Sequence, residues 1–416
     1  MSCIIKYSAS HPFPLQNLPY GIFSAPGRSA RPGVAIGDRI LDLYELSRSP
    51  HFAGAGVEPG VFQGDTLNAF VALPPATWSA FRAYLATLLT SDALTADSPL
   101  FVSRTAADTQ LHLPLHIGDY TDFYASLEHA TNCGTLLRGP ERALQPNWRH
   151  LPVAYHGRAS SIVPSGTSFH RPAAQILPPS ATQPIFAASQ RLDYELELGF
   201  VYGGPSTPLG TRLSPAAARE RIFGAVLLND WSARDVQSWE YVPLGPFLSK
   251  NFCTTISPWL VPLAALEPFR VAQATHEPPL LPYLRDPDGC NYDVPLYVEI
   301  KAPENEDYEA VAKSSLRHTY YTAAQMLAHH STSGCSMRAG DMLGTGTLSA
   351  PGEHGYGSLL EKTHMGKQPF ALGRRADMTW LRDGDSVRMT ALAQGEGFCI
   401  GFGECEGTVL PALPLQ

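Results

Sequence analysis

The pattern of apolar and polar positions predicts a chain rich in short β-strands. Over residues 192–201, Leu-Asp-Tyr-Glu-Leu-Glu-Leu-Gly-Phe-Val alternates with the period of two that a half-buried strand requires. Asp193, Glu195 and Glu197 should therefore share one face of that strand. An apolar run predicts another strand over residues 223–228.

Helical patterns are fewer and short. They cover residues 78–89, 216–222 and 322–330, and Asn-Asp-Trp-Ser at residues 229–232 is a helix N-cap signal. The pattern over residues 383–400 is typical of a hairpin or meander that closes the fold.

Length and the distribution of polar residues predict two domains. A chain of 416 residues exceeds one ordinary core of about 100 to 200 residues. Strand-like runs at residues 33–36 and 40–43 begin a small β-rich domain. Residues 100–117 mix apolar and polar positions without a clear period and suit a packed connection. Polar residues able to do chemistry become dense after it, so we predict domains over residues 1–118 and 119–416.

Composition and charge narrow the class of protein. Hydrophobic residues make up 44% and charged residues 16% of the chain, which are values of a folded globular protein. The net charge is -8 and there is no basic stripe, so we expect no nucleic-acid partner. No run approaches the roughly 18 apolar residues of a membrane span, and the start lacks a signal-peptide pattern. We expect a soluble, cytoplasmic protein without a membrane anchor.

The seven cysteines are scattered and form no C-x-x-C pair, which favours reduced thiols over a zinc or redox site. The absence of a set of histidine and cysteine ligands also argues against structural zinc. Cys133 and Cys253 lie near the residues discussed next. For Cys253, a buried spectator thiol is favoured over a soft metal ligand.

Four carboxylates indicate a divalent metal. Glu195 and Glu197 lie about 6 to 7 Å apart on one strand face, although a solvated strand face is the alternative. Asp122 and Asp230 both flank apolar segments that should be buried nearby. Carboxylates that meet without a cation repel one another, whereas Ca²⁺ or Mg²⁺ accepts such oxygen ligands. Ligand identity leaves the choice between these two ions open.

Two further groups could carry chemistry. His129 follows Asp122 by seven residues and could take a proton from water, although a structural histidine is the alternative. Arg234 and Gln237 recur at three-residue intervals from Trp231, so a helix would place all three near one face. With Lys250 and Tyr241 further along, they suit negative charge on a substrate or leaving group; a surface helix is the alternative.

Several motifs along the chain resemble the fumarylacetoacetate hydrolase family. They are DYTDFY, EHATN, LPVAYHGRASSI, DYELELGF, LLNDWSARDVQSWEYVPLGPF, TLSAPGEHGYGSLLE and GFGECEGTVLP, and FPLQNLPYGIF extends the match to the start. The resemblance implies an N-terminal SH3-like β-barrel domain over residues 1–118 and a C-terminal mixed β-sandwich roll over residues 119–416. It also implies a homodimer.

The same resemblance implies the reaction and the metal sites. The reaction is hydrolysis of 4-fumarylacetoacetate to fumarate and acetoacetate, the last step of tyrosine and phenylalanine breakdown. The family's catalytic metal would be held by Asp122, Glu195, Glu197 and Asp230. A second, magnesium-type site would use Asp230, Lys250 and Thr254, the lysine through its backbone carbonyl because an ammonium cannot bind a cation.

Catalytic and substrate-binding roles follow by matching position. His129 would be the general base and Glu361 the carboxylate that orients it, while Arg234, Gln237 and Lys250 would stabilise the leaving carbanion. The positions that would bind the small diketo acid are Tyr124, Arg138, Tyr155, Gln237, Tyr241 and Thr347. The alternatives are a keto-acid hydratase, decarboxylase or isomerase on the same scaffold, and a non-catalytic metal-stabilised binding module.

Overall fold

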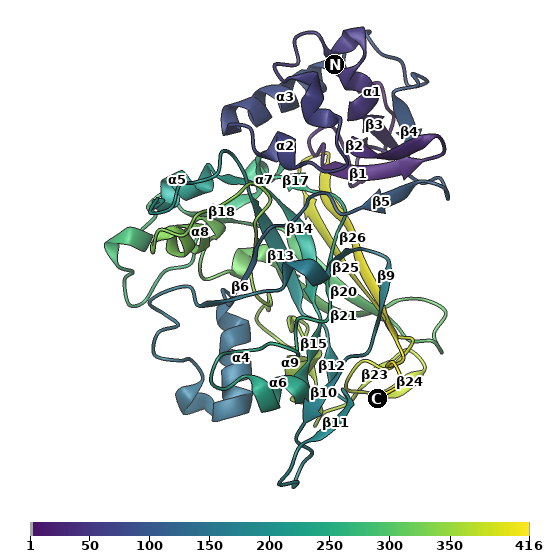
Figure 1. The fold of residues 1–416 in the computed structure, drawn as a ribbon. Helices are drawn as coiled ribbons and strands as arrows, with labels where there is room; N and C mark the ends of the chain where they lie inside the picture. The colour runs from purple at the N-terminus through teal and green to yellow at the C-terminus, as the bar shows by residue number, and fades with distance from the viewer. Residues whose placement is uncertain (1–2, 416) are drawn as a thin grey trace.

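The computed structural model describes residues 3–415, with a small N-terminal part above a larger C-terminal part (Figure 1). Both parts are built around β-sheets, with helices at their margins. The predicted fold class, mainly β with some α, is confirmed. Within residues 3–415, no helix combines the length and apolar character needed to cross a membrane.

A five-stranded antiparallel sheet forms the N-terminal part. Its strands, in spatial order, are β4 (Phe101–Ser103), β3 (Arg39–Asp42), β2 (Arg28–Ile36), β1 (Tyr20–Ala25) and β5 (Gln110–His112). Its helices are α1 (Leu43–Ser47), α2 (Asn68–Val71) and α3 (Pro75–Leu88). Residues 100–117, expected to be a connection, instead supply β4 and β5 because their backbones pair with β3 and β1.

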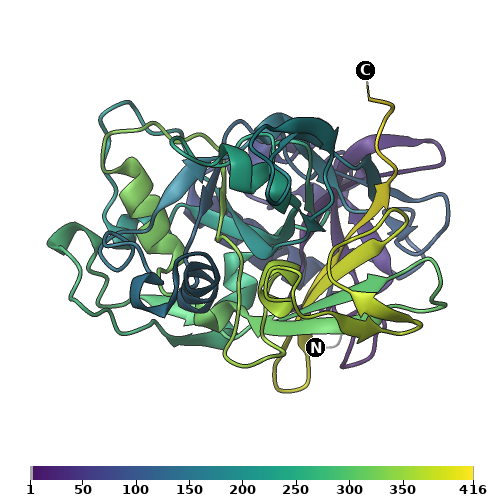
Figure 2. The same cartoon turned by 90° about the horizontal axis from the view of Figure 1, so that it is seen from below.

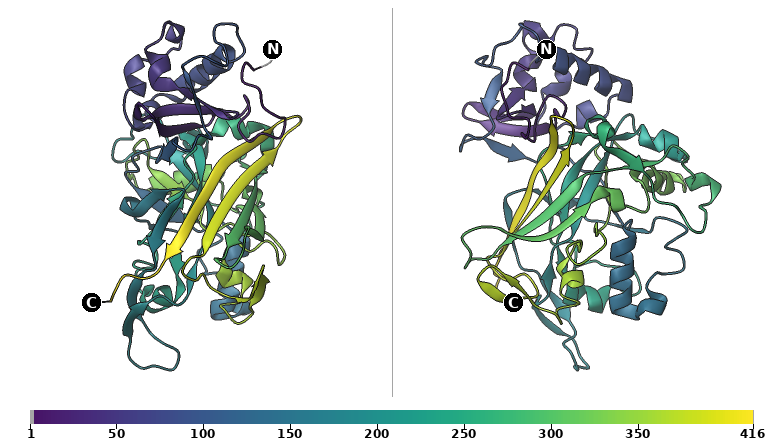
Figure 3. Two further views of the ribbon diagram at one scale, coloured as in Figure 1. Left: turned by 90° about the vertical axis from the view of Figure 1, so that its right-hand side faces the viewer. Right: turned by 180° about the vertical axis from the view of Figure 1, so that it is seen from behind.

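Two large sheets build the C-terminal part. The strands of the eight-stranded sheet are β7 (Ala154–His156), β6 (Tyr120–Phe123), β22 (Met342–Gly344), β13 (Leu196–Tyr202), β14 (Ile222–Asp230), β16 (Thr254–Ile256) and β8 (Ile162–Pro164), with β17 (Val261–Pro262) paired to β14. Those of the five-stranded sheet are β21 (Glu309–Ser315), β20 (Pro295–Lys301), β25 (Ser386–Gln394), β26 (Cys399–Leu410) and β9 (Thr167–His170). Strands β25 and β26, yellow in Figure 3, form the hairpin predicted over residues 383–400.

Smaller elements complete this part. The two-stranded pairs are β10 (Ala173–Ile176) with β11 (Ile185–Ala188), β12 (Leu192–Asp193) with β15 (Ser232–Ala233), β18 (Arg270–Ala272) with β19 (Cys290–Tyr292), and β23 (Phe370–Leu372) with β24 (Arg375–Met378). The helices are α4 (Leu127–Arg138), α5 (Pro215–Arg219), α6 (Arg234–Glu240), α7 (Leu263–Leu266), α8 (Ala323–Ser331) and α9 (Leu359–Lys362).

Aromatic packing joins the two parts. The ring of Phe223, at the start of β14, lies 5.0 Å from Trp78, 5.7 Å from Tyr20 and 5.8 Å from Phe70, measured between ring centres. These residues belong to one buried cluster that continues from the N-terminal sheet into the C-terminal sheet. Burial of such large rings contributes about 1.5 to 3 kcal/mol each, so the N-terminal part supports the sheet that carries the site.

The strand predicted over residues 192–201 is interrupted. Leu192 and Asp193 pair with β15, whereas β13 begins at Leu196 and lies between β22 and β14. All seven residues of β13 are buried, so the strand is covered on both faces and is not half-buried as predicted. The alternation arose from carboxylates that face a buried site instead of solvent.

The helix boundaries also differ from the predictions around β14. The predicted helix over residues 216–222 ends at Arg219, and the predicted strand over residues 223–228 extends to Asp230. The N-cap signal at residues 229–232 is wrong, because α6 begins only at Arg234 and Ala233 before it makes no side-chain cap. Trp231 therefore lies outside the helix and is buried, with its indole N–H donating to Thr255.

The helix predictions for residues 78–89 and 322–330 are confirmed. Helix α3 starts at Pro75. Proline lacks an N–H, but no hydrogen bond is lost because the first N–H groups of a helix have no acceptor within it. Helix α8 starts after Thr322, whose side chain forms a capping box with Gln325.

Candidate active site

Sheet register brings three predicted metal ligands together. Strand β6 carries Asp122, β13 carries Glu197 and β14 ends at Asp230, and β22 links β6 to β13 in the same sheet. One carboxylate oxygen from each of the three lies within 4.8 Å of the others, and all three side chains are buried. Gly344 on β22 pairs with Asp122, and a Cβ at Gly344 would lie 2.7 Å from Asp122 Oδ1. The glycine therefore leaves the space that this carboxylate occupies.

The carboxylates of Asp122 and Glu197 in this cluster are poorly compensated by protein groups. Among residues 3–415, Asp122 Oδ1 and both carboxylate oxygens of Glu197 are buried without a hydrogen-bond partner. Burial and the charge of Asp230 raise the pKa of Asp122 to about 7. Burial and the charge of Asp122 raise the pKa of Glu197 well above its usual range. Oxygen ligands that are buried and unpaired fit a hard divalent cation, which would remove the mutual repulsion.

Glu195 has cationic partners of its own. Its carboxylate contacts Lys250 Nζ and lies 2.8 Å from Arg234 Nη1. Burial would raise the pKa of Glu195, but the charges of Lys250 and Arg234 outweigh it and hold that pKa at about 2. Glu195 is thus beside the three clustered carboxylates and ionised.

The residues predicted for a second metal site meet at Asp230. Lys250 Nζ lies 2.6 Å from Asp230 Oδ2, and Thr254 Oγ1 donates to Asp230 Oδ1 at 3.2 Å. Tyr155 also donates its hydroxyl to Asp230 at 3.0 Å. The ammonium of Lys250 faces the carboxylates, and metal binding by its backbone carbonyl stays a prediction.

His129 and Glu361 form a buried pair. His129 follows the N-cap Ser126 of α4, and Glu361 lies on α9. Figure 2 shows these two helices nearly end-on and side by side, and they are in contact. The ring nitrogen Nδ1 of His129 lies 2.8 Å from Glu361 Oε2. The chemistry of the pair requires Nδ1 to carry the proton, which leaves Nε2 free as a base.

Three neutral donors hold the Glu361 carboxylate in place. The amide of Asn132 donates at 2.9 Å, Ser349 Oγ at 2.8 Å and Ser358 Oγ at 2.9 Å. Burial would raise the pKa of Glu361, but His129 and these donors lower it. None of the three was identified from the sequence. Asn132 and Ser358 stand three residues from His129 and from Glu361 in their motifs, but the contact of Asn132 with Glu361 depends on the packing of α4 against α9.

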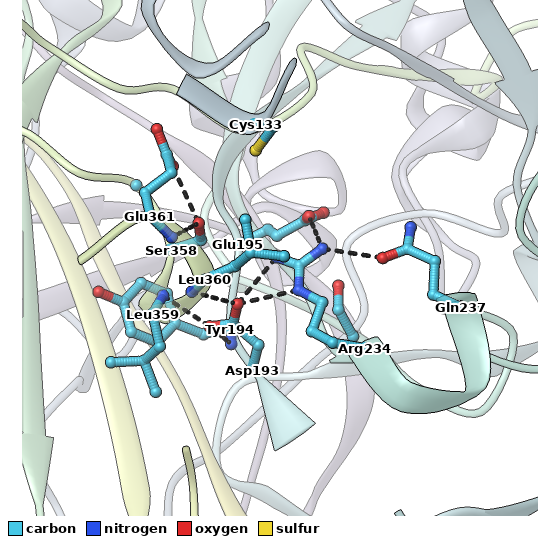
Figure 4. Close-up of polar contacts among 12 residues, drawn as sticks. Cys133, Asp193, Tyr194, Glu195, Arg234, Gln237, Ser358, Leu359, Leu360 and Glu361 are labelled. Atoms are coloured by element: carbon cyan, nitrogen blue, oxygen red, sulfur yellow. Dashed lines mark hydrogen bonds and ion pairs between the residues drawn. The ribbon is translucent and has the colours of Figure 1, made fainter. Parts of the chain in front are cut away.

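A buried ion pair positions Arg234 at the start of α6. Its Nε donates to Asp193 Oδ2 at 2.9 Å, and Asp193 also accepts hydrogen bonds from the backbone N–H groups of Leu359 and Leu360 (Figure 4). Arg234 Nη1 donates to Gln237 Oε1 at 3.2 Å, as the three-residue spacing predicted. Asp193 therefore supports the site without facing the carboxylate cluster, a role the sequence analysis missed. A fully buried acid in a strand needs a cationic partner, and this requirement is the signal that could have revealed the role of Asp193.

The groups above surround one cavity of about 410 Å³. Its lining includes Asp122, Glu195, Glu197, His129, Arg234 and Lys250. It also includes every predicted substrate-binding residue: Tyr124, Arg138, Tyr155, Gln237, Tyr241 and Thr347. The volume suits a small ligand, and a wall that mixes cations, tyrosines and a histidine suits an anionic one. Asp230, Thr254 and Glu361 are not part of this wall. Asp230 pairs with Lys250 and Glu361 with His129, both of which line the cavity, whereas Thr254 donates to Asp230.

Comparison with known proteins supports this picture over nearly the whole chain. Residues 119–410 match the model described as "Fumarylacetoacetate (FAA) hydrolase C-terminal", and residues 16–114 match "Fumarylacetoacetase N-terminal". A fumarylacetoacetase of Caenorhabditis elegans is 47% identical over 99% of this chain and 100% of its own length. One of Homo sapiens is 47% identical over 96% of this chain and 97% of its own.

A solved structure supports the fold. A fumarylacetoacetate hydrolase from Exiguobacterium antarcticum is similar with a TM-score of 0.53 and 18% identity, covering 95% of this chain and 99% of its own. At that identity the likeness concerns the fold alone. The family models and the curated relatives carry the assignment: the chain belongs to the fumarylacetoacetate hydrolase family.

Proposed function

We propose that this chain hydrolyses the carbon-carbon bond of 4-fumarylacetoacetate, giving fumarate and acetoacetate in the last step of tyrosine and phenylalanine breakdown. The observation that carries the proposal is the His129–Glu361 pair, whose histidine opens onto the same cavity as the carboxylate cluster. The relatives named fumarylacetoacetase, at 47% identity over nearly the full chain, support the substrate.

Asp122, Glu195, Glu197 and Asp230 would hold a divalent cation, either Ca²⁺ or Mg²⁺, because all four offer only carboxylate oxygens. When bound, that cation supplies Lewis acidity toward the oxygens of the diketone. Asp230 with Thr254 and Lys250 would serve a second, magnesium-type site. The unpaired oxygens of Asp122 and Glu197 support the first site more directly than the second.

The protein's own base would generate the nucleophile. Glu361 accepts the Nδ1 proton of His129, so Nε2 takes a proton from a water molecule. The resulting hydroxide adds to the carbonyl carbon next to the fumaryl double bond. The bond between this carbon and the methylene carbon then breaks, and its electron pair leaves with the acetoacetate fragment.

The departing carbanion needs stabilisation until it is protonated. Arg234, Gln237 and Lys250 line the same cavity, and they provide a guanidinium, an amide N–H₂ and an ammonium. Gln237 uses its carbonyl oxygen to accept from Arg234, which leaves its N–H₂ for the substrate. The proton held on His129 can then return to the acetoacetate carbon, which completes the hydrolysis.

Cations and hydroxyls would bind the two carboxylates of the substrate. Arg138 suits a carboxylate through its guanidinium, although two of its donors already bind the carbonyls of Arg142 and Ala143. The hydroxyls of Tyr124, Tyr155, Tyr241 and Thr347 surround the same space.

The assembly would be a homodimer in the cytoplasm. Apolar side chains are exposed beside the cavity in the loop after α6, where Val242 is 67%, Leu244 95% and Phe247 65% exposed. Such a patch is typical of a protein interface, and a second copy of this chain is the proposed partner. The seven free thiols suit a reducing compartment. Light scattering during size-exclusion chromatography would measure twice the 45.1 kDa chain mass if the dimer forms.

The experiment that tests the function is turnover of 4-fumarylacetoacetate with Mg²⁺ or Ca²⁺, and again after EDTA treatment. Loss of the diketone absorbance together with fumarate and acetoacetate in equal amounts is the expected result, and EDTA should abolish it. His129→Ala should lose hydrolysis and keep metal content and circular dichroism unchanged. Metal binding without these products would instead favour a keto-acid hydratase, decarboxylase or isomerase, and turnover that survives in His129→Ala would remove His129 from its role.

A further inference from the structure

Cys133 lies inside the active site, but the proposed hydrolysis gives it no task. It follows His129 by four residues on α4, which places both side chains on the same helix face. Its Sγ lies 3.6 Å from both ring nitrogens of His129, and its side chain is buried and lines the cavity. Figure 4 shows the sulfur pointing from its helix toward the side of the site where Glu195 lies.

His129, Cys133 and Glu361 together offer the donor set of a thiophilic metal. One ring nitrogen, the sulfur and one carboxylate oxygen lie within 4.8 Å of one another. A tetrahedral zinc with Zn–S of about 2.3 Å and Zn–N of about 2.0 Å separates sulfur and nitrogen by about 3.5 Å. The observed distance of 3.6 Å is close to that separation, but because it is the same to both nitrogens the sulfur lies over the face of the ring. The imidazole would therefore have to rotate to direct a nitrogen lone pair at an ion bound to Sγ. Histidines four residues apart on a helix bind zinc in other proteins, and here a cysteine takes the second position.

The sequence showed no His-plus-Cys set, which argued against structural zinc, whereas the structure brings a histidine and a cysteine together. The pair His129 and Cys133 was overlooked because its spacing is that of a helix face, and its third member lies 228 positions further along in α9.

We propose that His129, Cys133 and Glu361 form an inhibitory site for a thiophilic divalent metal of the Zn²⁺ class, separate from the all-oxygen cluster of Asp122, Glu197 and Asp230. Soft thiolate and imidazole ligands favour Zn²⁺, whereas Mg²⁺ and Ca²⁺ favour the oxygen cluster. Because Glu361 lies beside Nδ1, the ion would replace the proton on that nitrogen. The neutral imidazole would then carry its proton on Nε2, which could no longer accept one from water, so hydrolysis would stop. That consequence rests on the proposed function, whereas metal binding itself does not.

The charges around the cluster permit a cation there. Arg234 is close enough to Cys133 for their charges to interact, but it pairs with Asp193 and Glu195 at 2.9 Å and 2.8 Å. Glu361 brings a negative charge, and the cavity of about 410 Å³ gives an ion a route to Cys133. The fourth zinc ligand would be a water molecule from this cavity, as in zinc sites that have three protein ligands.

Co²⁺ binding to the full chain tests the site, because cobalt bound to a thiolate shows a charge-transfer absorption in the near ultraviolet. With Mg²⁺ in excess, one equivalent of Co²⁺ should produce this absorption in the wild type and in Cys253→Ala, which removes another buried thiol near the site. Cys133→Ala should lose it. Absence of the band in the wild type, its survival in Cys133→Ala or its loss in Cys253→Ala would each overturn the proposal.

Inhibition by Zn²⁺ tests the consequence separately. With each rate normalised to that variant's own rate without Zn²⁺, the Zn²⁺ concentration for half inhibition should rise at least about tenfold in Cys133→Ala, as expected for loss of a ligand. Equal inhibition of the wild type and Cys133→Ala would place the inhibiting ion elsewhere and overturn the proposal. If the wild type hydrolyses no 4-fumarylacetoacetate, the proposed function fails, and the Co²⁺ absorption still decides whether the metal site exists.

Discussion

The Nδ1 atom of His129 lies 2.8 Å from Oε2 of Glu361, and both side chains are buried. Burial disfavours the imidazolium, but the charges of Cys133 and Glu361 outweigh burial and hold the pKa of His129 well above its usual range. A carboxylate in this position fixes the ring, selects the tautomer and makes Nε2 a stronger base. Glu361 should therefore act on catalysis through His129.

Replacing Glu361 by glutamine should lower kcat by about 10²-fold or more, within the range typical of general-base contributions. The carboxylate stabilises protonated His129, so removing it lowers the pKa of the imidazole. His129 works as a base only when neutral, so kcat/KM rises with pH through this pKa. The acid limb of the kcat/KM profile should thus move to lower pH in Glu361→Gln, as measured by rates across a pH series.

The matching control is Ser358→Ala, which removes one donor to Glu361 but leaves its charge. Its acid limb should stay close to that of the wild type. A Glu361→Gln profile that keeps the wild-type midpoint would mean that Glu361 does not set the basicity of His129.

Removing one predicted metal ligand should weaken metal-dependent stability. Ligand at 100 times its Kd stabilises the folded state by about 2.7 kcal/mol, and a Kd raised 100-fold by Asp122→Ala reduces this to about 0.4 kcal/mol. Thermal unfolding with and without Mg²⁺ should therefore show a large shift in the wild type and almost none in Asp122→Ala. Isothermal titration would measure the change in Kd directly, and a wild-type Kd in the variant would exclude Asp122 as a ligand.

The sequence grouped the carboxylates of the candidate site correctly in space, but it predicted the local structure around them less well. The carboxylates Asp122, Glu197 and Asp230 were grouped because acids beside apolar runs need compensation, and the structure brings them together. The period of two identified the segment of Glu197 but not its burial on both faces. The alternation of apolar and polar residues predicts which side chains share a strand face. Whether other elements cover that face depends on the order of strands in the sheet, and a local sequence pattern does not contain this order.

Residues that act through long-range contacts escaped the sequence analysis. The sequence placed Asp193 on the same strand face as Glu195 and Glu197. In the structure the strand is interrupted near Tyr194, and Asp193 turns toward Arg234. Cys133 was noted only as lying near the site, since its relation to Glu361 depends on the packing of α4 against α9. Such pairings are set by tertiary packing.

Asp193→Ala should destabilise the protein by about 3 to 5 kcal/mol, because it leaves the buried guanidinium of Arg234 with one fewer anionic partner. It also removes the acceptor of the Leu359 and Leu360 amides. Chemical denaturation should measure this loss, with kcat falling as Arg234 shifts.

The control for this substitution is Asp383→Ala, which removes the 44% exposed partner of Arg171. A surface pair of this kind contributes about 0 to 1 kcal/mol, so its loss should be small. Equal losses in Asp193→Ala and Asp383→Ala would show that the buried pair adds no more than the surface pair.

The absence of a side chain at Gly344 should be needed for the metal site. A Cβ there would lie 2.7 Å from Asp122 Oδ1 and 3.0 Å from the hydroxyl of Tyr120, closer than carbon and oxygen normally approach. Gly344→Ala should therefore push the Asp122 carboxylate out of the cluster, raise the Kd for Mg²⁺ and lower kcat. Overpacking of this kind costs about 1 to 3 kcal/mol of stability.

Gly60→Ala is the control for Gly344→Ala, since its Cβ would meet nothing within 4 Å. Calorimetric titration of both variants with Mg²⁺ measures the Kd for the metal. An unchanged Kd in Gly344→Ala would mean that metal binding does not depend on where the pairing of β22 with β6 places Asp122.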